Sequence, residues 1–179
     1  MLLLIFVGKV LKINNMTRVN KILKSILILS SSFMLLQFSY AQNGSDKKKQ
    51  QEADLKTNIN NRHFVFVAQS VSPMSGGSRN LTSTYDLTIS GDTLTSNLPY
   101  FGRAYSAPIN PSDGGINFTT NSYKWIEKPR KKGGWEIQLN PKNGGDVRQM
   151  ALTISPNGSS LLRVISNNRQ PISFSGYTR

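Results

Sequence analysis

The sequence predicts an all-β domain built as an antiparallel meander, preceded by a short helix and an export signal. Three observations support this fold class. Apolar and polar residues alternate with a period of two from residue 63 to the C-terminus. Turn signals rich in Gly, Pro, Asn and Asp recur at intervals of roughly ten residues. No helix-length segment separates the predicted strands, which excludes the crossover connections that parallel strands require.

Within the first 41 residues, which we interpret as a signal peptide, the stretch from Met16 has the three parts of a cleavable signal peptide. A positively charged segment comes first, and its cations are Arg18, Lys21 and Lys24. An apolar run covers residues 25–38, and small residues at positions 39 and 41 precede the cleavage point. This run has about 14 residues, whereas a membrane-spanning helix needs about 20. We therefore expect cleavage between Ala41 and Gln42.

The export signal decides the expected location of the mature protein. We expect a periplasmic or secreted protein without a stable membrane anchor. The chain contains no Cys, which excludes disulfides, thiolate metal sites and a lipidated N-terminal Cys. Residues 1–15 contain a second short apolar run that does not fit the signal peptide. The simplest interpretation is that translation starts at Met16, and the alternative is an unusually long positively charged segment before the apolar run.

The net charge limits the possible partners. The chain carries a formal charge of +13 from 22 basic and 9 acidic residues. Five of the basic residues and none of the acidic ones lie in residues 1–41, so residues 42–179 carry +8. Such a charge favours anionic surfaces, although solubility and a loose attraction to a negatively charged envelope explain it more simply. Nucleic acid is not expected, because the basic clusters lack interleaved aromatic residues and the protein is exported.

Residues 42–61 are interpreted as a polar linker that continues into a short helix near residues 50–60. The linker contains the run Lys47–Lys49 and no apolar residue before position 53. Leu55 and Ile59 are four positions apart, so a helix would place them on one narrow apolar stripe. We expect this stripe to pack on the β-domain.

The β-domain is expected to cover residues 62–179. Its first strand, residues 63–71, has apolar residues on both faces, so both faces should be at least partly covered. Residues 85–90 and 93–98 should form a hairpin around Gly91–Asp92. The later segments with strand periodicity are residues 116–119, 123–128, 135–139, 148–154, 161–165 and 172–176.

These segments correspond to about eight strands. Thr120–Asn121 is either a turn between two strands or a bend inside one. An antiparallel meander of this size can close into a barrel whose interior holds core side chains or one small ligand. An open β-sandwich is the alternative architecture.

A series of short motifs resembles a known family. The motifs are Tyr85-Asp-Leu, Gly91-Asp92, Leu98-Pro-Tyr-Phe-Gly-Arg-Ala-Tyr105, Gly114-Gly-Ile-Asn-Phe118, Asn157-Gly158, Asn168-Arg169 and Ile172-Ser-Phe-Ser-Gly176. Together they resemble domain of unknown function 4251, a family of small secreted bacterial proteins, over roughly residues 50–179. The resemblance implies export and a lipocalin-like β-barrel or a closely related β-fold. It implies no activity and no catalytic residues.

The sequence contains no convincing catalytic or metal-binding set. His63 is the single histidine and stands at the start of a predicted strand, where a surface role is the simplest interpretation. Glu127 and Glu136 could face one another across a hairpin, but pairing with the basic residues of the turn explains them better. We expect a protein that is not an enzyme and uses no metal or cofactor.

The most informative segment for binding follows the predicted strand 93–98. It contains the candidate ligand-binding residues Tyr100, Phe101, Arg103 and Tyr105. Aromatic side chains on a loop at the end of a barrel could stack on a sugar or a flat ligand, while the arginine binds an anion. Alternatively, Tyr100 and Phe101 plug the end of the barrel and Tyr105 packs on a neighbouring strand.

These observations support two functional hypotheses. The first is an exported, non-enzymatic and monomeric binding module for a small apolar or glycan-like ligand. The second is a structural or interaction protein of the cell envelope that binds a partner protein or an anionic surface through its basic turns and edge strands.

Overall fold

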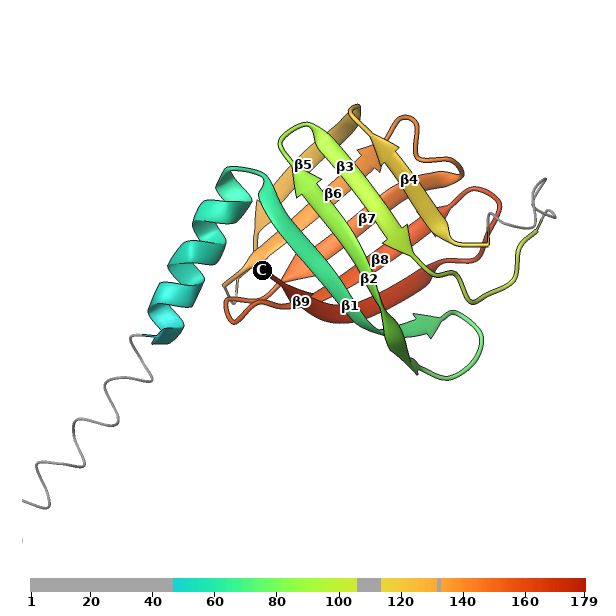
Figure 1. The fold of residues 1–179 in the computed structure, drawn as a ribbon, viewed down its shortest axis with the longest axis horizontal. Coiled ribbons are helices and arrows are strands. Elements are labelled where there is room, and N and C mark those ends of the chain that lie inside the picture. The colour runs from blue at the N-terminus through green and yellow to red at the C-terminus, as the bar shows by residue number, and fades with distance from the viewer. Residues whose placement is uncertain (1–46, 106–113, 132) are drawn as a thin grey trace, which may run out of the picture. The chain divides into compact units, whose positions relative to one another are not determined.

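The computed structural model describes residues 47–105, 114–131 and 133–179. Within these residues one sheet contains nine strands, which are β1 (His63–Pro73), β2 (Arg79–Ser90), β3 (Thr93–Leu98), β4 (Ile116–Thr120), β5 (Tyr123–Pro129), β6 (Trp135–Pro141), β7 (Val147–Ile154), β8 (Ser159–Ser166) and β9 (Ile172–Thr178). Their order in the sheet is β4-β3-β2-β1-β9-β8-β7-β6-β5 (Figure 1). The predicted signal peptide lies outside the described residues.

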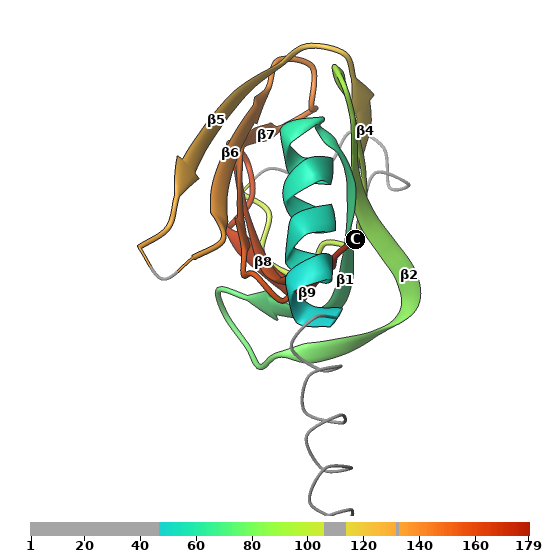
Figure 2. The same ribbon diagram turned by 90° about the vertical axis from the view of Figure 1, so that its left-hand side faces the viewer.

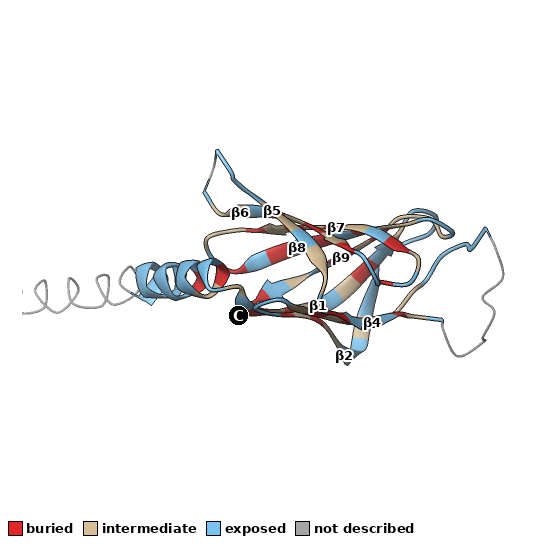
Figure 3. Cartoon of the chain, turned by 90° about the horizontal axis from the view of Figure 1, so that it is seen from above, coloured by how far each residue is buried: buried red, intermediate tan, exposed pale blue. Residues whose placement is uncertain are grey.

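All pairs of neighbouring strands are antiparallel, and the sheet curls into a nearly closed barrel. The closure depends on β1, which pairs with β2 on one side and with the C-terminal strand β9 on the other. The main chains of Val65 and Arg179 exchange two hydrogen bonds of 3.0 Å at the end of this seam. Figure 3 shows two layers, with β1, β2 and β4 in one wall and β5 to β8 in the other. The predicted all-β meander and barrel are confirmed.

The barrel is interrupted between β4 and β5, which are consecutive in the chain but are not paired with each other. Nine strands cannot form a closed ring in which every neighbouring pair is antiparallel. If strand direction is followed through the antiparallel pairs, β4 and β5 have the same sense. The chain therefore continues through residues 121–122 from one wall into the other, at a corner of the barrel (Figure 2).

Side chains stabilise this corner. The Thr120 hydroxyl accepts a hydrogen bond of 3.2 Å from the Ser122 main-chain N–H, which tightens the bend. The Tyr123 hydroxyl donates to the Gly91 carbonyl in the turn between β2 and β3. The sequence left open whether residues 120–121 separate two strands or bend one strand. In the structure β4 and β5 are two separate strands in different walls, which gives nine strands where about eight are predicted.

A helix at residues 47–60 stands over one end of the barrel (Figure 2). Residues 47–49, which are predicted as linker, belong to this helix, so its described part extends beyond the expected range of 50–60. Leu55 and Ile59 are buried in the core, as the apolar stripe predicts. Residues 49–179 form one compact unit.

The end of the helix is joined to the barrel through Arg62. This residue adopts a left-handed conformation with φ of 52°, which stops the helix and turns the chain into β1. Its carbonyl accepts a hydrogen bond of 2.8 Å from the Gly91 N–H. Its guanidinium lies 5.2 Å from the centre of the Trp125 ring, and Trp125 contacts Phe64 edge-to-face at 6.2 Å. The helix, the first strand and the far wall therefore meet at this end.

The core is made by the inward-facing side chains of the strands. Phe66 on β1 and Phe174 on β9 are fully buried, as are Leu87 on β2 and Leu152 on β7. The inward-facing apolar residues of the other strands, which alternate with outward-facing residues, pack with these four side chains in one hydrophobic cluster. The end of the barrel opposite the helix, which we call the mouth, is formed by the connections at residues 74–78, 99–105, 142–146 and 167–171 (Figure 1).

The seam between β1 and β9 generates a prediction about stability. Gly176 pairs with Ala68 beside a register shift in β1, and a Cβ at Gly176 would overlap the carbonyl oxygen of Val67. Gly176→Ala should therefore lower the free energy of unfolding by about 1–3 kcal/mol. Urea denaturation followed by circular dichroism measures this change. Gly77→Ala is the control because a Cβ there meets nothing within 4 Å, and equal stability of the two variants would contradict the close approach at the seam.

Candidate functional site

The segment at residues 99–105 leaves β3 and runs across the mouth. It is joined to the connection between β8 and β9 by an isolated bridge between Ala104 and Arg169. The Tyr105 N–H donates to the Asn168 carbonyl at 2.8 Å, and the Gln170 N–H donates to the Arg103 carbonyl at 3.1 Å. The backbone of this segment is therefore positioned by main-chain hydrogen bonds.

Arg169 connects three of the chain segments at the mouth. Its Nε and Nη2 donate to the two carboxylate oxygens of Asp146 at 2.8 and 2.6 Å. Its Nη1 donates to the Gly115 carbonyl at 2.8 Å. The side chains of Arg169 and Asp146 are only 18% and 16% exposed, so solvent screens the ion pair weakly. A bidentate arginine–carboxylate pair of this kind fixes both distance and orientation.

Tyr100 packs beneath this arginine, with the centre of its ring 4.9 Å from the guanidinium carbon of Arg169. Its hydroxyl lies 2.9 Å from the Arg103 carbonyl and 3.1 Å from the Gln170 carbonyl. Gly102 is required here because a Cβ at that position would lie 2.7 Å from the Tyr100 hydroxyl oxygen. Burial raises the pKa of the Tyr100 hydroxyl, and the charge of Arg169 partly offsets this effect.

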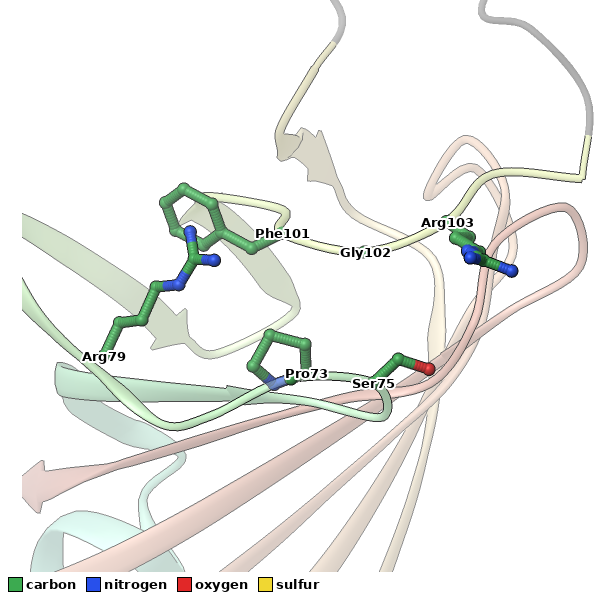
Figure 4. A pocket seen from close by; sticks show the side chains of 7 residues that line it. Pro73, Ser75, Arg79, Phe101, Gly102 and Arg103 are labelled. Carbon is green, nitrogen blue, oxygen red and sulfur yellow. The ribbon is translucent and has the colours of Figure 1, made fainter.

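A groove opens at the mouth between the tip of the β1–β2 hairpin and the segment 99–105 (Figure 4). Its volume is about 580 Å³, and its lining residues are Pro73, Ser75, Gly76, Arg79, Phe101, Gly102 and Arg103. This volume lies within the range of small-molecule sites, which is about 300–1,000 Å³. The Arg79 side chain reaches toward Phe101, and its guanidinium carbon is 5.7 Å from the centre of the ring.

The structure separates the four predicted site residues. Phe101 and Arg103 line the groove. Tyr100 lies behind it and supports the backbone, which agrees with the structural alternative for this residue. Tyr105 is 68% exposed and is not among the lining residues. Whether any of the four binds a ligand stays a prediction.

Sequence reasoning missed the opposite side of the groove, which is formed by Pro73, Ser75, Gly76 and Arg79. The turn signal of residues 72–78 is visible in the sequence. The hydroxyls of Ser72 and Ser78 lie 3.2 Å apart and brace this turn. No local pattern could have placed the turn beside residues 101–103, since their proximity depends on how the barrel curls.

The other candidate groups are distributed on the surface. His63 is exposed, and its Nδ1 lies 3.3 Å from the Ser90 hydroxyl. Glu136 lies opposite Lys128, whereas Glu127 lies opposite Ile137, so the two glutamates point to opposite faces of their hairpin. The possibility that they face one another across the hairpin is therefore excluded. Among the described residues no group of three or more His, Asp or Glu side chains could hold a metal ion.

Comparisons with known proteins identify similarity to one family. The family described as domain of unknown function 4251 matches residues 46–178. A crystal structure of a member of that family from Bacteroides eggerthii is similar, with a TM-score of 0.52 and 17% sequence identity. The match covers 72% of this chain and 86% of that chain, and at this identity it concerns the fold alone. No curated protein matches the chain significantly.

The ion pair at the mouth generates a prediction about stability. Arg169→Lys should lower the free energy of unfolding by about 1–3 kcal/mol, because a lysine cannot make the bidentate contact with Asp146 and also reach the Gly115 carbonyl. Urea denaturation measures the loss. Arg163→Lys, on the exposed face of β8, is the control and should change stability by less than about 0.5 kcal/mol. Equal midpoints for the two variants would show that Arg169 does not hold the mouth together.

The half-buried tyrosines Tyr100 and Tyr123 generate a second prediction. Burial raises the pKa values of Tyr100 and Tyr123 in the folded state, so folding favours the neutral hydroxyls. Their contribution to stability is complete below the unfolded pKa of about 10 and is lost as the pH rises through the folded values. The free energy of unfolding should fall above pH 10, and it should fall less steeply in Tyr100→Phe. A slope that is identical in the variant and the wild type would contradict this assignment.

Proposed function

The chain belongs to the family called domain of unknown function 4251, and we propose that it is an exported, non-enzymatic module that binds a small ligand at the mouth of its barrel. The observation that supports this proposal most directly is the groove between residues 73–79 and 101–103. The groove combines an aromatic ring, a proline, a hydroxyl and two guanidinium groups. Polar groups of this kind fix the orientation of a ligand in small-molecule sites, and the aromatic ring and the proline offer apolar contact surface.

The anchoring of the groove also supports binding. Arg103 and Gly102 lie on a backbone that Tyr100 and the β8–β9 connection hold in place. Preorganised sites lose less conformational entropy when a ligand binds. The ligand is expected to be apolar or glycan-like, with the Phe101 ring and Pro73 contacting its apolar surface. Export follows from the charged segment, apolar run and small residues that precede Gln42.

Within the described residues, no helix has the length and the apolar character that crossing a membrane requires.

A second function is favoured by a different observation. Lys128, Arg130 and Lys131 are all exposed at the turn between β5 and β6, and β5 is an edge of the sheet. Basic residues at the end of an edge strand could bind an acidic partner or an anionic surface of the cell envelope. This interaction would leave the groove empty, so the retention of a ligand at the mouth distinguishes the two functions.

Mass spectrometry of the protein purified from its own host tests the proposed function. The denatured mass should equal that of residues 42–179, because the signal peptide is removed after Ala41. The native mass should exceed it by the mass of a retained small molecule. A polypeptide that begins before Met16 would contradict export, and a native mass equal to the denatured mass would contradict a retained ligand.

Two variants locate the ligand. Phe101→Ala removes the ring of the groove and should reduce the fraction of protein with bound ligand at least several-fold. Tyr105→Ala is the matched control, because Tyr105 is a neighbouring exposed aromatic residue outside the lining. Ligand lost equally from both variants, or from neither, would place the binding site elsewhere.

A further inference from the structure

We propose that the groove is selective for an acidic glycan, and that Arg79 and Arg103 bind its negatively charged groups. This inference rests on the proposed function and restricts the expected ligand to one chemical class. The lining contains two arginines and no acidic residue, so the groove presents positive charge from both of its sides.

The two arginines of the groove differ from the third arginine at the mouth. Arg169 is neutralised by Asp146 through two short hydrogen bonds. Within the described ranges this is the single ion pair, and neither Arg79 nor Arg103 has a carboxylate partner. Both are exposed to solvent. The two guanidinium groups beside the groove therefore keep their positive charge.

The position of Arg79 suits the binding of an acid group. The guanidinium of Arg79 lies over the Phe101 ring, and its central carbon is 5.7 Å from the centre of that ring (Figure 4). An aromatic ring attracts a guanidinium through its face and does not consume its N–H donors. The N–H groups of Arg79 therefore stay available for a carboxylate or sulfate, which an arginine binds with two parallel hydrogen bonds.

The position of Arg103 is set by its backbone. Its carbonyl oxygen lies 2.9 Å from the Tyr100 hydroxyl and accepts the Gln170 N–H at 3.1 Å. The side chain extends from this fixed point into the lining, on the far side of Gly102 from Phe101 (Figure 4). The two cations thus belong to different chain segments, and a ligand that reaches both must carry acid groups along its length.

The remaining lining favours a sugar over a bare anion. Pro73 and Phe101 offer apolar faces that suit the C–H faces of a sugar ring, and Ser75 offers a hydroxyl. A ligand that stacks on these groups and carries acid substituents uses every part of the groove. Chains of uronic acids and sulfated sugars have this chemistry.

Isothermal titration calorimetry tests the inference with protein from the producing cells from which any retained ligand has been removed by dialysis. The acidic probes are trigalacturonate, a sulfated heparin disaccharide and inorganic phosphate, and the neutral probe is fully methyl-esterified trigalacturonate. At least one acidic sugar should bind tenfold or more tightly than the neutral probe, and its affinity should fall as salt is added. Tighter binding of phosphate than of either sugar would overturn the glycan assignment.

Charge-removing variants assign the binding to the two arginines. Arg79→Gln and Arg103→Gln should each weaken binding of the acidic sugar about tenfold, with unchanged melting temperatures. Arg163→Gln removes an equal charge from an exposed position on β8 and should bind as the wild type does. Three results would each overturn the inference: equal binding of acidic and neutral probes, undiminished binding in both groove variants, or no binding of any acidic probe.

The proposed function can be separated from this inference. Equal binding of acidic and neutral probes would leave the proposed binding function intact. If the protein from its own host carries no ligand and also binds none of the four probes, the proposed function is refuted as well.

Discussion

The pairing of the first strand with the last is the constraint on which the rest of the structure depends. β1 hydrogen-bonds to β9, and this contact turns an open meander into a nearly closed barrel. Because every pair is antiparallel, nine strands cannot close without one interruption. The interruption falls where β4 passes into β5, and a threonine and a tyrosine stabilise the chain at that corner. The closure also gathers the connections that form the mouth at one end.

The mouth is held together mainly by polar contacts, in contrast to the apolar core. Arg169 joins the β6–β7, β8–β9 and β3–β4 connections through Asp146 and the Gly115 carbonyl. Tyr100 lies beneath it and touches the backbone of residues 102 and 103. The groove is therefore positioned by a rigid support whose charges are satisfied. Of the two proposed binding groups, Arg103 projects from this support and Arg79 faces it from β2. Neither has a carboxylate partner among the described residues.

Much of the barrel is predictable from the sequence because most strands have one face in the core, which imposes an apolar–polar alternation. The stripe of Leu55 and Ile59 is predictable for the same reason. Alternation fails for the first half of β2, residues 79–84, where Leu81 alone packs against the core and the other residues are exposed. Arg79 lies in this stretch, so the sequence offered no sign of its strand or its place in the groove. The contacts of Arg169 span 23 and 54 positions along the chain, and local patterns do not report such distances.

The central claim is that the groove at the mouth is a ligand site. A crystal structure of the protein from its own host, without added ligand, tests it most directly. The account predicts electron density for a small molecule between residues 73–79 and 101–103, with an acid group within hydrogen-bonding distance of Arg79 or Arg103. A groove that contains only water, or that is filled by Phe101 and the arginines themselves, would contradict it.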